Sequence, residues 1–386
     1  TMSDGTTDTN RSGGLGFAVV GAILLVVMPL LNLLPPEDSW FHLSDFSLNR
    51  FGKFLAFAIL ALGLDLIWGY TGILSLGQGV FFGLGAYCMG MHMMLTIGKE
   101  SVYGSDMPDF MVWNQVKELP FFWKPFYSFP AAVIGALLVP MAFALVFGFF
   151  AFRSRIKGVY FAIITQALAL AAWLVFNRND TNLGGTNGLT DFKQVLGYRL
   201  SEPGTQRALY VITVLCLGAT YLLCRWIIRS RAGRVLVAVR DSEKRVVFSG
   251  YTPANYKLFV FVVSAGLAGL AGLLYAPQVG IITPAQIGVL PSLEMVIWVA
   301  VGGRGSLAGA VLGAVSVNYG RSVLTNYFPE LWPFILGGLF VLVVLLFPDG
   351  MVGMIRKGKS LLTQRKAAEE KPAVPDRKVA VSEGKR

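Results

Sequence analysis

The sequence predicts an all-α protein, a polytopic transmembrane bundle of about ten helical spans, some of them broken or re-entrant. Of the 386 residues, 54% are hydrophobic and only 14% are charged, a composition that a soluble core does not require. The apolar residues gather in runs of about 20, long enough to cross a hydrocarbon core of about 30 Å. Basic residues collect in links between these runs, as they do in cytoplasmic loops of membrane proteins.

The ends of the apolar runs place the spans along the chain. The first run, 15–34, ends at Pro35-Pro36 with no small-residue cleavage signal, so we expect a retained span and not a signal peptide. The remaining expected spans are one that begins in the stretch 69–87 and ends near 97, and the runs 51–68, 131–152, 159–176, 208–228, 258–275, 291–301, 306–323 and 331–347.

Charge gives the expected orientation. The links 153–157 and 229–257 are basic and should be cytoplasmic, which places both termini in the cytoplasm if the spans number about ten. The net charge of +11 therefore indicates positive-inside bias and attraction to the lipid bilayer, and no nucleic-acid binding is expected. We expect a disordered segment at 1–14, one transmembrane domain at 15–350 and a basic cytoplasmic tail at 351–386.

Two stretches interrupt the helical pattern. Six glycines break the apolar run 69–87, and broken helices at membrane depth are buried in protein or line a cavity. Gln78 is a candidate pathway residue there, while close helix packing explains most of the glycines. The run 291–301 is short and suggests a re-entrant segment. After it, glycines recur every four residues and predict a helix-packing face, at Gly305, Gly309 and Gly313.

A few polar residues fall inside the apolar runs. An ionisable group in a span is a functional candidate by default, which applies to Asp65 and Glu294. Asp65 lies near the end of its run, so a capping or interfacial role competes with a functional one. Glu294 could instead pair with a nearby base or the backbone. Gln166 is either a pathway group or the donor of an interhelical hydrogen bond.

The most distinctive stretch is the basic segment from Arg225 to Lys257. It carries eight Lys and Arg residues against two acids, between two apolar runs. Residues 234–248 alternate apolar and charged side chains at helical spacing and predict a helix on the membrane surface or docked on a partner. Gly250 is a candidate stop for that helix. The segment is either a contact site for a soluble partner or a solvated topology signal.

The side chains for enzyme chemistry are not grouped in the sequence. The three cysteines lie inside apolar runs without metal spacing, and the two histidines have no ligand pattern, so we expect no metal site and no catalytic residues. The stretch Gly302–Gly305 is no phosphate loop, because it lacks the GK[ST] ending and no strand precedes it. We therefore expect a transporter or pore that binds no cofactor of its own.

Several long stretches of the chain resemble a known protein family. ALGLDLIWGYTGILSLGQGVFFGLGAY (61–87), RAGRVLVAVRDSEKRVVFSGY (231–251) and the region 266–313 resemble inner-membrane permeases of ABC importers in the branched-chain amino-acid uptake family. Several stretches look most like its urea-uptake branch: 109–130, GGTNGLTDF at 184–192, 277–314 and 331–348. Gln78 stands where related permeases often carry His, which argues against a fixed chemical role for it.

The resemblance implies a bacterial inner-membrane importer. A second, homologous permease subunit would complete the channel, two cytoplasmic ATPase subunits would use the ATP, and a periplasmic protein would deliver the substrate. The segment 229–257 would be the coupling loop, in which Arg240, Asp241, Glu243 and Gly250 match the family's signature region and should meet the ATPase.

Urea is the substrate that the resemblance favours. A urea site needs hydrogen-bond acceptors for the amides, a donor for the carbonyl and little charge. The residues we expect along such a path are Gln78, Gln166, Glu294 and Asn318. Two alternatives stay open: the same architecture carrying branched-chain or other amino acids, and a stand-alone channel or secondary carrier.

Overall fold

The computed structural model describes residues 21, 23–34, 36, 43–98, 103–154, 156, 158–346 and 350–353. The expected disordered segment 1–14 and nearly all of the expected tail lie outside these residues. Helices make up most of the described chain. In chain order they are η1 (Ile23–Val27), α2 (Met28–Leu33), α3 (Asp45–Thr71), α4 (Gln78–Ile97), α5 (Asp109–Trp113), η3 (Lys124–Tyr127), α6 (Phe129–Arg153), α7 (Val159–Phe176), η4 (Asn179–Thr181), η5 (Gly185–Asn187), α8 (Pro203–Arg229), α9 (Arg231–Phe248), α10 (Pro253–Val279), η6 (Pro284–Gln286), α11 (Val289–Gly302), α12 (Leu307–Tyr327), η7 (Pro329–Leu331) and α13 (Trp332–Leu346).

Six helices of the described chain are long and apolar enough to cross a membrane: α3, α4, α6, α7, α8 and α10. They coincide with six of the predicted spans, so the chain is a multi-pass helical membrane protein. The other predicted spans overlap shorter or less apolar elements, namely η1 with α2, α11, α12 and α13. The count of about ten crossings therefore stays a prediction.

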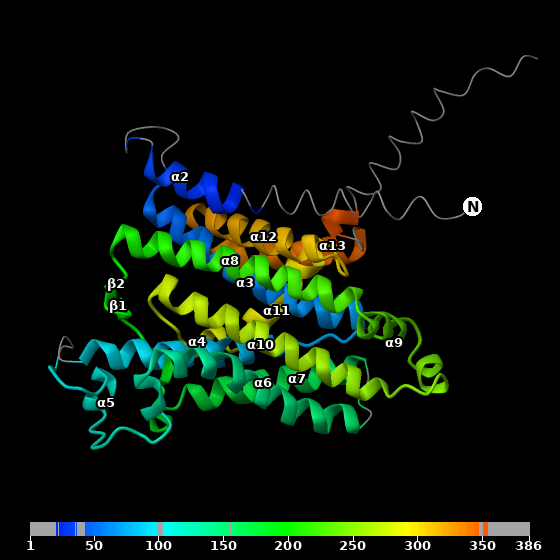
Figure 1. The fold of residues 1–386 in the computed structure, drawn as a ribbon, viewed down its shortest axis with the longest axis horizontal. Helices are drawn as coiled ribbons and strands as arrows, with labels where there is room; N and C mark the ends of the chain where they lie inside the picture. Colours follow the sequence, from blue (N-terminus) through cyan, green and yellow to red (C-terminus); the bar gives the residue numbers. More distant parts are fainter. Residues whose placement is uncertain are drawn as a thin grey trace, which may run out of the picture.

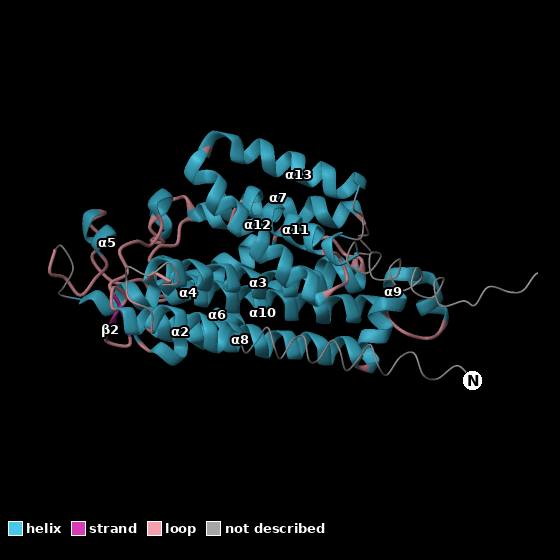
Figure 2. Cartoon of the chain, turned by 90° about the horizontal axis from the view of Figure 1, so that it is seen from above, coloured by secondary structure: helices cyan, strands magenta, loops and turns pink. Residues whose placement is uncertain are grey.

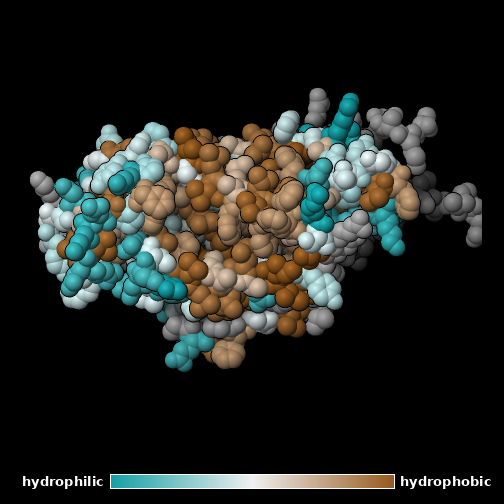
Figure 3. Space-filling view, turned by 90° about the horizontal axis from the view of Figure 1, so that it is seen from below, coloured by the Kyte–Doolittle hydropathy of each residue, from teal (hydrophilic) through white to brown (hydrophobic). Residues whose placement is uncertain are grey.

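The spans divide into an inner and an outer group. In α3, α4 and α10, 78%, 89% and 72% of the most apolar window is buried inside the protein, against 22%, 28% and 33% in α6, α7 and α8. Figure 2 shows α3 and α10 in the middle of the bundle, with α13 on one side and α8 on the other. Hydrophobic residues form a broad band across the middle of the face in Figure 3, between hydrophilic ends. A lipid-facing surface requires this distribution.

Glycines allow the inner helices to approach closely. A Cβ on Gly85 of α4 would lie 2.2 Å from the carbonyl oxygen of Gly269 in α10. A Cβ on Gly269 would in turn lie 2.2 Å from the carbonyl oxygen of Ala136 in α6. Real Cβ atoms do not come this near to backbone, so only glycine fits, as in small-residue interfaces of membrane helices.

The two ends of the bundle differ in structure. At one end α9 lies beyond the spans, and at the other lie α5 and a small antiparallel hairpin of β1 (Gln194–Val195) and β2 (Tyr198–Arg199) (Figure 1). We call these the α9 end and the α5 end. Helix α3 runs toward the α9 end, and α10 starts just after α9 and runs away from it.

The predicted interruption at 69–87 is narrower than expected. Helix α3 continues through Thr71 and α4 begins at Gln78, so only 72–77 leave the helical conformation. Gly72 starts this segment in the left-handed region, with φ of 78°. The amide of Leu76 donates to Thr165 Oγ1 at 3.0 Å, which holds the segment against α7. Gly77 also lies in this segment, while Gly69, Gly79, Gly83 and Gly85 lie within the two helices.

Candidate functional site

A cavity of about 750 Å³ opens between α3, α10, α11 and α12. It is lined by residues from the beginning of α3 and α11 and from the end of α10 and α12. Because α10 runs away from α9, its last residues lie in the half of the bundle remote from α9. We call this hollow the charged cavity. The residues used below are Arg50, Lys53, Phe57, Tyr275, Glu294, Trp298, Asn318 and Arg321.

Charge in the cavity is predominantly positive. Its lining includes three cations, Arg50, Lys53 and Arg321, and one carboxylate, Glu294. Arg321 Nη1 forms an ion pair with Glu294 Oε2. Arg50 Nη1 donates to Ser322 Oγ at 3.0 Å. The cavity is therefore suited to a ligand that carries a negative group.

Lys53 occupies a distinctive position in this lining. Its ammonium lies 5.8 Å from the ring centroids of both Phe57 and Tyr275, within cation–π range. Phe57 also packs 4.9 Å from Trp298, centroid to centroid. The aromatic rings hold the ammonium within an apolar wall, so the cavity presents a charge and a hydrophobic surface side by side.

The structure brings two of the four predicted pathway residues into the cavity. Glu294 and Asn318 line it, and Asn318 Nδ2 also donates to the carbonyl oxygen of Ala314 at 2.8 Å. Gln166 is half-buried on α7 and does not line it. Gln78 is buried as the first residue of α4, and its Nε2 has no hydrogen-bond partner in the described part of the chain.

Sequence reasoning missed the cavity's cations. Lys53 and Arg321 stand at the margin of predicted spans, where basic residues usually extend to the lipid headgroups. A lysine inside the apolar run 51–68 was the available signal, because intramembrane cations mark transport paths. Gln278 was missed as well, and its Nε2 donates to Thr213 Oγ1 at 2.5 Å.

The α9 end of the molecule is organised around the surface helix that the sequence predicted. Ser230 caps α9 by accepting a hydrogen bond from the amide of Gly233 at 3.2 Å. The helix is interrupted at Ser242, whose φ of −160° and ψ of 96° are not helical. The kink follows Arg240 and Asp241 directly, so two of the predicted contact residues lie beside a bend.

The four predicted contact residues do not face the same way. Asp241 is exposed, with 58% of its side chain accessible, although Arg240 Nε donates to it at 3.1 Å. Arg240 Nη1 turns toward the bundle and donates to the carbonyl oxygen of Gly69 at 2.8 Å. Glu243 forms an ion pair with Lys257 at 2.9 Å. Gly250 follows α9 with φ of 83°, a conformation that favours glycine.

The end of α3 receives a second arginine from far along the chain. Arg304 Nε donates to the carbonyl oxygen of Trp68 at 3.2 Å, and its guanidinium lies 5.2 Å from the Trp68 ring centroid. The amide of Gly305 donates to Asp65 Oδ1 at 2.7 Å. We call Asp65, Arg240, Arg304 and Gly305 the α3-end cluster. It joins α3, α9 and the turn between α11 and α12.

The three regularly spaced glycines have two different surroundings. Gly309 and Gly313 lie on α12 against α11, where a Cβ on Gly313 would lie 2.0 Å from the carbonyl oxygen of Trp298. Gly305 precedes α12, has φ of 76° and approaches Gly69 of α3. The four-residue spacing thus identifies two contacts of α12 with α11, and its first member belongs to the turn instead.

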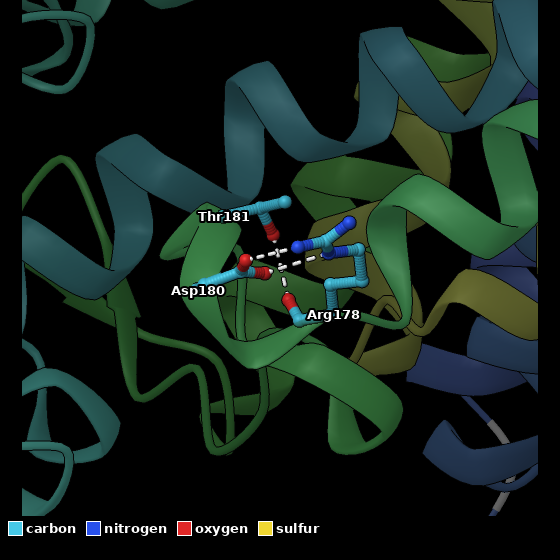
Figure 4. Close-up of polar contacts among 3 residues, drawn as sticks. All are labelled: Arg178, Asp180 and Thr181. Carbon is cyan, nitrogen blue, oxygen red and sulfur yellow. Dashed lines mark hydrogen bonds and ion pairs between the residues drawn. The ribbon is translucent and has the colours of Figure 1, made fainter.

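An exposed polar knot lies in the loop after α7, near the α5 end. Arg178 forms an ion pair with Asp180 and accepts, through its carbonyl oxygen, a hydrogen bond from Thr181 Oγ1 at 2.7 Å (Figure 4). The Arg178 side chain holds the pKa of Asp180 below its usual range, chiefly through its hydrogen bond. These groups are exposed, so the knot orders the loop locally and offers no enclosed site.

The described residues were searched for groups that could hold a metal ion or a nucleotide phosphate. Within the ranges given above, no group of three His, Cys, Asp or Glu residues is placed to hold a metal ion. One string, GMIRKGKS at 353–360, has the letters of a phosphate-binding loop. Such a loop requires a strand before it and a helix after it. No strand follows β2 in the described chain, and 354–360 lie outside it.

Comparison with known proteins adds the family. Residues 47–344 match the model described as "Branched-chain amino acid transport system / permease component". The high-affinity branched-chain amino acid transport system permease protein LivM of Salmonella typhimurium (strain LT2) is 25% identical over 92% of this chain and 81% of its own. LivM of Escherichia coli (strain K12) is 26% identical over 88% and 78%. BraD of Pseudomonas aeruginosa, with the same description, is 25% identical over 77% and 91%. No solved structure matches the chain.

Proposed function

The chain belongs to the branched-chain amino acid transport permease family, and we propose that it forms one half of the channel of an ATP-driven importer. Membership implies a multi-pass protein of the inner membrane that works with ATPase and binding-protein partners. In the proposal, a second homologous permease completes the channel and two ATPase subunits bind at the α9 end. The α9 end, with its basic residues, is then cytoplasmic, as are both termini.

The charged cavity is the observation that carries this proposal. It lies in the half of the bundle remote from α9, which is the periplasmic half in the proposed orientation. A substrate released there by a periplasmic binding protein would enter a cavity whose lining includes Arg50, Glu294 and Arg321. The opposite end offers α9 for an ATPase contact. Entry at one end and energy input at the other are what an importer subunit requires.

The lining of the cavity favours an amino acid with an apolar side chain. A carboxylate can bind beside Lys53 or Arg50, an ammonium group beside Glu294, and an aliphatic side chain against Phe57 and Trp298. These are the few convergent polar groups on an apolar wall that small-molecule sites use. The names of the relatives, which are branched-chain amino acid permeases, support the same substrate class.

Urea is the second candidate, and it rests on the stretches at 109–130, 184–192, 277–314 and 331–348 that resemble the urea-uptake branch. Urea is neutral, and the lining contains three cations and one carboxylate, more charge than a urea site needs. The cavity and the relatives both favour the amino acid over the urea expectation. A stand-alone channel or carrier would leave the α9 segment without a partner.

Uptake in cells that express the full predicted set of subunits tests the proposal. Radiolabelled leucine and radiolabelled urea are supplied separately, each with the other unlabelled compound in excess, and each with an active or a disabled ATPase. We expect leucine uptake that requires the active ATPase and ignores urea. Urea uptake that requires the ATPase and ignores leucine would assign the urea branch. Uptake of either compound without the ATPase would refute the importer assignment.

A further inference from the structure

The α3-end cluster joins three parts of the chain that a driven transporter must move together. Arg240 comes from the surface helix α9, Arg304 and Gly305 come from the turn between α11 and α12, and both sets of contacts converge on the last turns of α3. Arg240 and Arg304 place their charge at the carboxyl end of α3, where the helix dipole favours cations. The cluster is thus a junction between α9 and helices that line the charged cavity.

Asp65 lies at the centre of this junction. Its side chain is fully buried, and Oδ1 accepts the amide hydrogen of Gly305, while Oδ2 has no hydrogen-bond partner among the described residues. Arg304 and Arg240 are the cations whose charge acts on it. Buried carboxylate oxygens are normally paired. The free oxygen therefore leaves Asp65 able to accept a further bond if a neighbouring arginine moves.

Helix α3 and the turn between α11 and α12 are packed so closely that neither can move without the other. A Cβ on Gly69 would lie 2.1 Å from Asp65 Oδ1 and 2.5 Å from the Gly305 nitrogen. The turn connects α11, which carries Glu294, to α12, which carries Asn318. A displacement at the α3 terminus is therefore passed to the helices that shape the cavity, because packed helices move as rigid bodies.

We propose that the α3-end cluster is the relay that couples α9 to the charged cavity, with Asp65 as the fixed anchor and Arg240 as the moving contact. The proposal rests on the proposed function, in which an ATPase acts on α9. The kink at Ser242 provides the joint beside Arg240. When α9 moves, Arg240 leaves the Gly69 carbonyl oxygen and pairs with Asp65 Oδ2, which shifts the turn held by Gly305. Arg240 and Asp65 are positioning residues in this scheme.

The test uses the complete importer in proteoliposomes and measures ATP hydrolysis with and without the substrate-loaded binding protein. The ratio of the two rates reports coupling. Arg240→Gln should lower that ratio by about tenfold, the size of a typical coupling between sites. Arg178→Gln removes the same charge from the exposed loop after α7, away from α9. This control should keep the wild-type ratio.

Two further variants separate a relay from a merely structural contact. Arg240→Lys keeps the charge and should recover part of the ratio. Asp65→Asn keeps an acceptor for the Gly305 amide and removes the charge, so its effect should be non-additive with Arg240→Gln. A wild-type ratio in Arg240→Gln, or an equal loss in Arg178→Gln, would overturn the relay. A wild-type complex without ATP-dependent uptake would instead refute the proposed function.

Discussion

The charged cavity and the α3-end cluster share helix α3 and use charge in opposite ways. The turn that carries Arg304 and Gly305 connects α11 to α12, the two other helices that line the cavity. In the cavity, Lys53 and the Glu294–Arg321 pair surround a hollow of about 750 Å³. At the other end, the charges of Arg240 and Arg304 are bound to α3 carbonyl oxygens, and a neighbouring hollow measures only about 140 Å³. Charged side chains around a cavity are available to bind a ligand. Charged side chains that are hydrogen-bonded to backbone carbonyl oxygens hold helices together instead.

The largest effect should come from breaking the contact between α11 and α12, the two helices that the turn of the α3-end cluster connects. Gly313→Val would place a Cβ 2.0 Å from the Trp298 carbonyl oxygen and separate α12 from α11. We expect a loss of more than about 4 kcal/mol of stability, seen as loss of the monodisperse peak in detergent size-exclusion chromatography. Gly320→Val on the same helix has open space around its Cβ and should behave as wild type. Equal behaviour of the two variants would contradict the packing argument.

Removing the cavity's carboxylate should have the next largest effect. Glu294→Gln leaves the Arg321 guanidinium without its partner, at a cost of about 1 to 3 kcal/mol because the pair is only partly exposed. Thermal unfolding in detergent measures this loss. The double variant with Arg321→Gln should be more stable than Glu294→Gln alone, since it leaves no unpaired charge. Additive losses would show that the two residues do not act as a pair.

A smaller and more selective effect is expected at Lys53. Lys53→Met keeps most of the side-chain volume within the aromatic wall and removes the charge. We expect the KM for leucine uptake to rise about tenfold, because one charge-assisted hydrogen bond is lost. Lys117→Met, at an exposed position near the α5 end, is the matched control. An unchanged KM in Lys53→Met would remove this lysine from the substrate path and favour a neutral substrate.

The smallest effect should come from the loop knot, which belongs to neither region. Because Arg178 lowers the pKa of Asp180, the ion pair contributes stability above the unfolded pKa of an aspartate and loses it as pH falls through the lower folded value. Full exposure makes this contribution small. Asp180→Asn and wild type should therefore have nearly the same thermal midpoint at pH 7, and any difference should shrink as the pH falls through the lowered pKa of Asp180. A large difference at pH 7 would show that the loop supports the bundle.

Much of the fold could be predicted because the helices follow from local composition. Runs of apolar residues of sufficient length fix α3, α4, α6, α7, α8 and α10, since a helix satisfies its backbone hydrogen bonds within one segment in a bilayer. The exact ends of the helices depend on capping residues, which apolar runs do not locate. Helix α3 was expected from 51 but begins at Asp45, after Ser44, whose side chain accepts the amide hydrogen of Ser47. The surface helix α9 was likewise visible in its periodicity.

The roles of the two buried acids could not be separated by sequence. Both Asp65 and Glu294 were predicted as either functional or structural. The structure gives Asp65 the amide of Gly305, which is 240 positions away, and gives Glu294 the side chain of Arg321 beside a hollow. Local sequence fixes that a carboxylate lies in an apolar run, while its partner depends on which helices meet there.

Local sequence was enough to identify a helical membrane protein, to locate its main spans and to predict a basic surface helix after α8. These features depend on hydropathy and periodicity, which act over one element at a time. The packing of the helices brings Lys53, Glu294 and Arg321 to one cavity and brings Arg240 and Gly305 to the end of α3. Those contacts join segments up to about 270 residues apart, and their geometry is set by close packing between helices.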